Sequence, residues 1–209
     1  WHADPTETVL RKIRAAEGHP GVLDEIAGVG FHLFGAHRER GLRGAPGEIV
    51  AQRHGAICRA TVDGAVWITH LRRSGPQETH IKLPATLALK LAGRPVTVRE
   101  VAGPLHDRPG ADGTLREIFY EEDAGVGYLH FDFYNGAMST EQCRRLRAAY
   151  LHARSRRKTR VIVLMGGTDF FSNGIHLNVI EAADDPAGES WRNLHAMNDV
   201  VREIVETDS

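Results

Sequence analysis

The chain has 209 residues, of which 42% are hydrophobic and 25% are charged, values that fit a soluble globular protein with one large or two small domains. It contains no apolar run of about 18 residues, which excludes a membrane-spanning helix. Residues 1–95 carry 13 basic and 9 acidic side chains, whereas residues 96–209 carry 13 and 18. This shift predicts a boundary near residue 95, and neither part is basic enough to indicate nucleic-acid binding.

The N-terminus has neither the basic start nor the apolar core of a signal peptide. It also lacks an initiator methionine, so we expect the chain to begin inside a longer protein. Cys58 and Cys143 form no motif, and we predict that both are buried, idle thiols of a cytoplasmic protein.

The first residues of the chain predict the start of a helix. Asp4 is the predicted N-cap, Pro5 takes the first helical position, and Glu7 follows three residues after the cap. The stretch 18–21, which contains two glycines and a proline, ends this helix.

Short strands separated by glycine-rich turns follow, up to about residue 75. The strongest signal is the Asp63-Gly64 turn, which predicts a hairpin between the apolar runs 56–62 and 65–71. The regular spacing of the turns predicts a small β-barrel.

The order of these elements resembles the C-terminal, OB-like domain of the formyltransferase family, which includes methionyl-tRNA formyltransferase. The segments that carry the resemblance are Ile13-Arg14-Ala15, Pro20-Gly21, Pro46-Gly47-Glu48-Ile49 and the Asp63-Gly64 hairpin. The resemblance implies that the formyl-transfer residues, and most of the 10-formyltetrahydrofolate site, belong to a separate domain before Trp1.

Basic residues near the start of this part offer an alternative. They are His32, His37, Arg38, Arg40 and Arg43. A metal or anion site is conceivable, but the histidine spacing matches no zinc pattern, and solvated loop residues explain these positions better. A barrel of this kind can bind RNA, although no stripe of aromatic and basic residues accompanies the arginines here.

The second part begins after a short helix at 83–91 and a segment rich in proline, glycine and charge. We therefore expect a first domain at 1–92, a linker at 93–114 and a second domain at 115–209. Strands are predicted at 116–120 and 126–134.

In the second of these strands, His130 and Asp132 share one face. They could form an acid/base pair, but a solvated sheet face explains them more simply. Ser139 and Gln142 form a capping box for the next helix, and the apolar run 161–165 predicts a strand buried on both faces. Further helices are expected from about His176 and from about Glu189.

The loop after the buried strand resembles the first oxyanion-hole segment of the crotonase (enoyl-CoA hydratase/isomerase) superfamily through Phe171-Ser172-Asn173-Gly174-Ile175-His176-Leu177. The resemblance implies that the backbone N–H of Ile175, after Gly174, donates to a thioester oxygen. The residues that it places against the acyl-CoA are Asn135, Ser172, Asn173 and His176. His176 stands where the family usually has aspartate. An ordinary strand–turn–helix junction is the alternative.

Together the two resemblances point to a family of [NiFe]-hydrogenase maturation factors that join a formyltransferase half to a crotonase half. They imply an α+β or α/β multidomain chain: a small OB-like barrel followed by the N-terminal half of a crotonase-type ββα spiral domain. In that family formyl-tetrahydrofolate and coenzyme A yield formyl-CoA, from which carbon monoxide is released for the active-site iron.

The resemblance also implies cofactors and partners. The cofactors are coenzyme A and 10-formyltetrahydrofolate, the partners are hydrogenase maturation proteins, and neither membrane, metal nor nucleic acid is expected. The catalytic acid/base is expected after Ser209. Two alternatives stay open: a generic enoyl-CoA hydratase/isomerase with an unrelated leader, and a tRNA- or partner-binding formyltransferase-like module.

Overall fold

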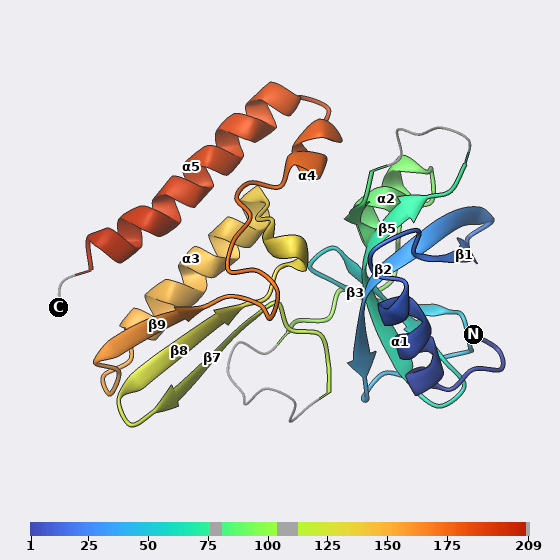
Figure 1. Ribbon diagram of the computed structural model, residues 1–209, viewed down its shortest axis with the longest axis horizontal. Helices are drawn as coiled ribbons and strands as arrows, with labels where there is room; N and C mark the ends of the chain where they lie inside the picture. The colour runs from blue at the N-terminus through green and yellow to red at the C-terminus, as the bar shows by residue number, and fades with distance from the viewer. Residues whose placement is uncertain (76–80, 104–112, 208–209) are drawn as a thin grey trace. The chain divides into compact units, whose positions relative to one another are not determined.

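The computed structural model describes residues 1–75, 81–103 and 113–207, which form a mixed α/β fold (Figure 1). They divide into two compact units, the first made of 1–103 with 113–115 and the second of 116–207. Each unit has its own sheet, and within these ranges no strand belongs to both. No helix in the same ranges is long and apolar enough to cross a lipid bilayer.

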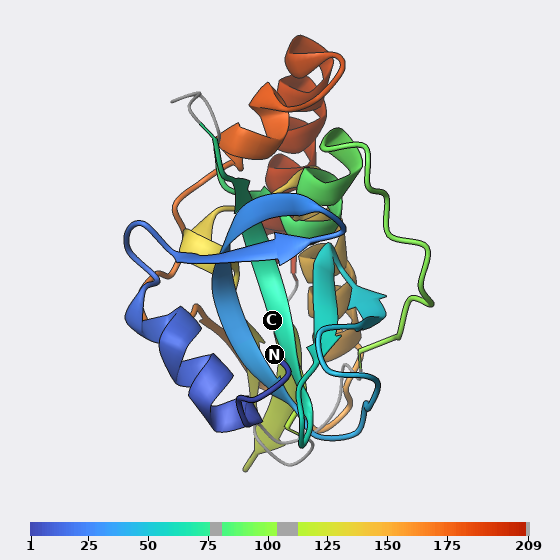
Figure 2. The ribbon, with the colours of Figure 1, turned by 90° about the vertical axis from the view of Figure 1, so that its right-hand side faces the viewer.

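The first unit is built on a six-stranded antiparallel sheet in the order β1-β2-β5-β4-β3, with β6 paired to β5 (Figure 2). The strands are β1 (Val22–Ile26), β2 (Val29–Glu39), β3 (Ile49–Arg53), β4 (Ala56–Ala60), β5 (Ala65–Arg73) and β6 (Leu83–Pro84). The hairpin predicted around Asp63-Gly64 is confirmed, because β4 and β5 pair directly across that turn.

The sheet is not closed into the barrel that the turn spacing predicts. Strands β1 and β3 lie at the two ends of the order, and β3 pairs along its outer edge with a later segment instead. The Gln52 N–H donates to the Arg99 carbonyl at 3.1 Å, and the Val101 N–H donates to the Gln52 carbonyl at 2.9 Å. Turn residues specify hairpins between neighbouring strands, but they do not specify this pairing between distant segments.

Helix α1 (Thr6–Ala15) packs Val9, Leu10 and Ile13 into the core of the first unit. The predicted cap was wrong: Pro5 stands at the N-cap position, and Asp4 pairs with Lys12. The Thr6 N–H has no acceptor within the helix and donates a hydrogen bond to a residue that is distant in sequence. Asp63 Oδ1 accepts hydrogen bonds from the Thr6 backbone N–H and hydroxyl, both at 2.7 Å.

Part of the predicted linker packs against the first unit, after helix α2 (Ala85–Leu91). Arg53 is only 4% exposed, and its guanidinium donates to the Val101 carbonyl at 2.9 Å and to the Leu115 carbonyl at 2.7 Å. It also donates to the Thr114 hydroxyl at 2.9 Å and lies 4.6 Å from the centre of the Trp67 ring. The buried Arg53 side chain therefore holds Val101, Thr114 and Leu115 against the sheet.

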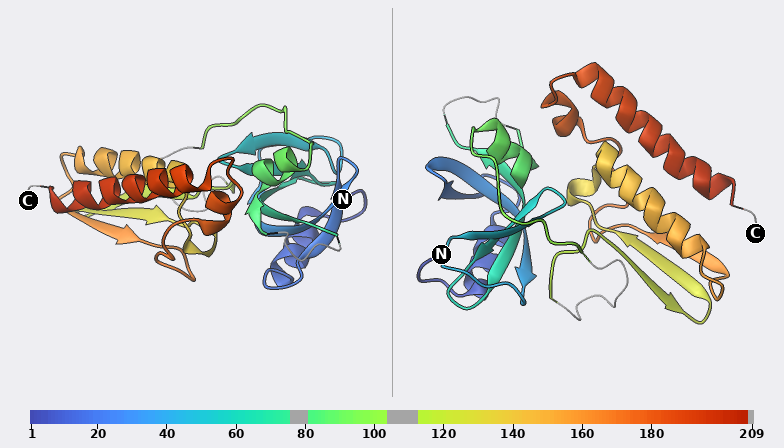
Figure 3. Two further views of the ribbon diagram at one scale, coloured as in Figure 1. Left: turned by 90° about the horizontal axis from the view of Figure 1, so that it is seen from above. Right: turned by 180° about the vertical axis from the view of Figure 1, so that it is seen from behind.

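The second unit contains a three-stranded sheet in the order β7-β8-β9, with β7 antiparallel and β9 parallel to β8. Helix α3 lies against this sheet, and α5 runs alongside α3 (Figures 1 and 3). The elements are β7 (Ile118–Asp123), β8 (Val126–Phe131), a 3-10 helix (Tyr134–Gly136), α3 (Thr140–Arg154), β9 (Val161–Met165), α4 (Leu177–Glu181) and α5 (Pro186–Val205).

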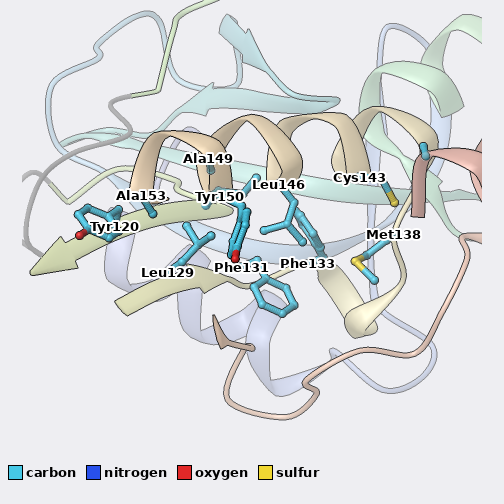
Figure 4. Packing of buried hydrophobic residues seen from close by; sticks show 12 residues of the cluster. Tyr120, Leu129, Phe131, Phe133, Met138, Cys143, Leu146, Ala149, Tyr150 and Ala153 are labelled. Atoms are coloured by element: carbon cyan, nitrogen blue, oxygen red, sulfur yellow. The ribbon is translucent and has the colours of Figure 1, made fainter. Parts of the chain in front are cut away.

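The core of this unit lies between α3 and the sheet (Figure 4). Its buried residues are Ile118, Tyr120, Leu129, Phe131, Phe133, Met138, Cys143, Leu146, Ala149, Tyr150, Ala153 and Ala196. Cys58 and Cys143 are both free and buried, as predicted.

Three predictions for this unit have different outcomes. The capping box of Ser139 and Gln142 is confirmed at the start of α3. The strand buried on both faces was wrong, because β9 is an edge strand among the described residues and Val161 is 55% exposed. Helix α5 starts at Pro186, before the predicted start at Glu189, because Asp185 caps it by accepting from the Gly188 N–H at 3.0 Å.

Candidate functional site

The structure brings together the two loops that contain all the predicted site residues. The Asn173 N–H donates to the Gly136 carbonyl at 2.7 Å, and the Met138 N–H donates to the Gly174 carbonyl at 2.9 Å. The His176 N–H donates back to the Met138 carbonyl at 3.0 Å. These bonds form a short parallel bridge in which Met138 lies opposite Ile175.

This bridge determines where the Ile175 amide points. The Ile175 N–H shares a planar trans peptide group with the Gly174 carbonyl, which points at Met138, so the N–H points the opposite way. The Ile175 carbonyl accepts from the Leu177 N–H at 3.0 Å. Within the described ranges, no hydrogen bond uses the Ile175 N–H as donor. The donor is therefore available to a ligand, which the sequence assignment requires.

Glycine is required where the two loops touch. Gly136 has φ +66°, and a Cβ atom there would lie 2.7 Å from the Phe170 Cβ and 3.1 Å from the Asn173 nitrogen. Asn135 is also left-handed, with φ 54°, as is Gly174, with φ +82°. Left-handed residues on both loops bend the chain sharply and allow the two backbones to approach each other.

The predicted acyl-CoA residues divide into exposed and buried side chains. Asn135, Ser172 and Asn173 are exposed, and the Ser172 hydroxyl accepts from the Gly174 N–H at 3.2 Å. His176, in contrast, is buried, with only 6% of its surface exposed. Its Nδ1 accepts from the Val179 N–H at 3.4 Å as the N-cap of α4, and burial lowers the pKa of its imidazole.

Asn193 is a buried site residue that sequence reasoning missed. It lies on α5, and its side-chain amide contacts both Met138 and His176. The helical spacing of the sequence could have indicated that Asn193 is buried. The buried side of α5 contains Ala196, Met197 and Val200 together with this one asparagine. A polar residue on an apolar helical stripe requires a hydrogen-bond partner within the core.

A cavity of about 200 Å³ lies beside the loop, among α3, α5 and the strands β8 and β9. The loop contributes Phe171 and Ser172 to its wall, whereas Ile175 does not line it. The other lining residues are Phe131, Met138, Cys143, Leu146, Tyr150, Leu164, Met197, Val200, Val201 and Ile204. Such a lining suits a small apolar group rather than a charged one.

The acid/base pair considered at His130 and Asp132 does not form. His130 Nε2 hydrogen-bonds to the Glu121 carboxylate at 3.1 Å, and its ring stacks on Phe119 with centroids 4.1 Å apart. Partial burial, and then the charge of Asp169, raise the pKa of the Asp132 carboxyl.

The interpretation of the basic residues of the first unit as solvated loop residues was wrong for three of them. His32, His37 and Arg38 lie on strand β2 rather than in a loop. Burial, and then the charge of Arg14, lower the pKa of His37 to about 4, so this imidazole is neutral near pH 7. In the part of the chain that the structure describes, no three His, Cys, Asp or Glu side chains are grouped as metal ligands.

Comparison with known proteins first relates part of the chain to a family of domains. Residues 1–85 match the family model of the formyl transferase C-terminal domain, which accounts for most of the first unit. The chain is also 47% identical, over 207 residues, to the hydrogenase maturation factor HoxX of Bradyrhizobium diazoefficiens. The resemblance to hydrogenase maturation factors of this type is confirmed, and it covers 99% of this chain and 34% of that protein.

Solved structures agree with this likeness. The crystal structure of HypX from Aquifex aeolicus in complex with tetrahydrofolic acid superposes with a TM-score of 0.90 and 46% identity, over 98% of this chain and 35% of that one. A variant of the same HypX gives a TM-score of 0.89 and 47% identity, over 99% and 36%. The chain therefore spans about a third of the length of these relatives.

Proposed function

We propose that this chain is a segment of a hydrogenase maturation enzyme that makes formyl-CoA from 10-formyltetrahydrofolate and coenzyme A and releases carbon monoxide for the active-site iron. In this proposal 1–92 is an OB-like formyltransferase C-terminal domain, 93–114 is a linker, and 115–209 is an incomplete crotonase-type domain that acts on the acyl-CoA. The formyl-transfer residues precede Trp1, and the catalytic acid/base follows Ser209. The enzyme works in the cytoplasm with other maturation proteins.

The extent of the likeness supports this proposal over its alternatives. Identity of 47% runs across both units, and an unrelated leader joined to an ordinary hydratase would not give that pattern. The bound tetrahydrofolic acid of the HypX crystal structure supports a folate as the source of the formyl group.

The observation that carries the assignment to acyl-CoA is the Ile175 amide, which points away from Met138 and has no bond from its N–H within the described ranges. A fixed donor of this kind stabilises negative charge on a thioester oxygen. In the release of carbon monoxide the C–S bond breaks, the sulfur leaves with its electron pair, and the formyl hydrogen is transferred as a proton to that sulfur, so the products are the coenzyme A thiol and CO.

The test supplies the full-length protein with 10-formyltetrahydrofolate and coenzyme A and measures formyl-CoA and CO. Ile175→Pro, which removes the N–H, should lower CO release from formyl-CoA by roughly 10²–10³-fold. Ile175→Ala keeps the N–H and should change the rate by no more than about threefold.

Binding of coenzyme A serves as the control, because proline can also distort the loop. Its affinity should be unchanged in Ile175→Pro if only the donor is lost. Equal turnover by the wild type and Ile175→Pro would exclude Ile175 as the donor, and absence of CO from the wild type would refute the proposed reaction.

A further inference from the structure

Asn193 is fully buried, with 0% exposure, and its side chain joins helix α5 to the two loops of the site. Its Nδ2 donates to the Met138 carbonyl at 3.0 Å, and its Oδ1 accepts from the His176 N–H at 3.3 Å. Nδ2 also lies 3.8 Å from the Cys143 sulfur. Both ends of the amide therefore have partners.

The two backbone groups that Asn193 binds are also bound to each other, because the His176 N–H donates to the Met138 carbonyl. The Asn193 amide, the Met138 carbonyl and the His176 N–H therefore form a closed ring of hydrogen bonds. This ring includes the bond from His176 to Met138, which belongs to the Met138–Ile175 bridge. An isolated bridge with so few hydrogen bonds opens easily, since local stability depends on buried contacts. A buried amide that loses its partners would leave polar groups unsatisfied, so this ring resists opening.

We propose that Asn193 is a positioning residue that fixes the direction of the Ile175 N–H by holding the Met138–Ile175 bridge closed. This inference rests on the proposed function of Ile175 as the oxyanion donor. The bridge orients the peptide group between Gly174 and Ile175, and Asn193 holds the next peptide group, which contains the His176 nitrogen. Asn193 itself does not touch the reacting atoms.

A purely structural role makes a different prediction, and the same helix pair supplies the comparison. The Thr140 hydroxyl donates to the Glu189 carboxylate at 2.6 Å, which also links α3 to α5 but has no contact with the bridge. If Asn193 only fastened α5, then removal of the Thr140 hydroxyl would have the same effect on the reaction. Asn198 is an exposed asparagine on the same helix and provides a second control.

The experiment compares Asn193→Leu, Thr140→Val and Asn198→Leu in the full-length protein. We expect Asn193→Leu to lower kcat for CO release from formyl-CoA by roughly tenfold or more, because a small misplacement of a catalytic donor is costly. The Kd of coenzyme A should stay within about threefold, and the His176 amide should exchange its hydrogen roughly tenfold faster or more. Thr140→Val and Asn198→Leu should leave both the rate and the exchange within about twofold.

Equal loss of kcat in Asn193→Leu and Thr140→Val, or unchanged exchange at His176, would overturn the proposal. If the wild type does not convert formyl-CoA, the proposed function fails, and exchange at His176 still decides whether Asn193 holds the bridge. If Asn193→Leu does not fold, then Asn193→Asp, which keeps the size and removes the Nδ2 donor to Met138, is measured in the same way.

Discussion

Asp63 Oδ1 lies 2.7 Å from both the backbone nitrogen and the hydroxyl oxygen of Thr6, a residue 57 positions earlier in the chain. These two bonds, the backbone bond first, hold the pKa of the Asp63 carboxyl below its ordinary value. The turn that forms the β4–β5 hairpin therefore also caps α1, so the helix and the hairpin stabilise each other.

The first prediction concerns the pH dependence of this cap. Because the pKa of Asp63 is lowered in the fold, its contribution is present above the ordinary aspartate pKa of about 4 and is lost as the pH falls through the lowered value. Urea unfolding should therefore show a stability difference between the wild type and Asp63→Asn at pH 7 that shrinks near pH 3. A difference that does not vary with pH would contradict the role of the carboxylate.

His176 should matter for the fold, contrary to what a surface position would imply. His176→Ala removes the N-cap of α4 and should lower the free energy of unfolding by about 1–2 kcal/mol, whereas His176→Asn supplies another good cap and should cost less. Thermal and urea unfolding measure both changes. Equal stability of His176→Ala and the wild type would show that the cap contributes nothing.

The same histidine predicts a second pH effect. Burial lowers its pKa from 6.5, so the unfolded chain takes up the proton first as the pH falls. Stability from the neutral imidazole is therefore complete above pH 6.5 and is lost towards the folded-state pKa. Relative to His176→Asn, the wild type should therefore lose stability as the pH falls below 6.5, which urea unfolding at several pH values measures.

The two glycines of the site offer a matched pair. Alanine at either left-handed position costs roughly 1–2 kcal/mol of backbone energy. Gly136→Ala should cost about 1–3 kcal/mol more, because its Cβ would meet Phe170 and Asn173, whereas a Cβ at Gly174 would meet no atom within 4 Å. Urea unfolding of the two variants tests this order, and a larger loss in Gly174→Ala would contradict the packing described here.

Arg53→Lys should weaken the attachment to the sheet of the segment that follows α2. Lysine cannot reproduce the forked contacts to Val101, Thr114 and Leu115, so the variant should lose roughly 2–3 kcal/mol of stability. Trypsin should then cut faster after Arg99, whose carbonyl pairs with β3. Arg11→Lys, at an exposed position on α1, is the control and should behave as the wild type does.

Predictions from the sequence succeeded where a few adjacent residues determine the structure. The Asp63-Gly64 hairpin and the capping box of Ser139 and Gln142 depend on contacts within four residues, and both are confirmed. The role of the Ile175 amide as a donor was also inferred from a local pattern, at 171–177, and it stays a prediction.

The sequence did not indicate contacts between residues that are distant in the chain. The Met138 carbonyl is 55 residues from Asn193, and the Leu115 carbonyl is 62 residues from Arg53. No spacing rule connects such pairs, because the fold alone brings them together. The burial of His176 has the same origin, since an N-terminal helix position is exposed unless another element covers it.

The parallel bridge between Met138 and Ile175 also limits how these loops can change in length. Along paired backbone, alternate residues direct their N–H groups to opposite sides. Inserting or deleting one residue between Gly136 and Met138, or between Asn173 and Ile175, would turn the outward amide inward. Homologous loops should therefore vary in their side chains far more readily than in their number of residues.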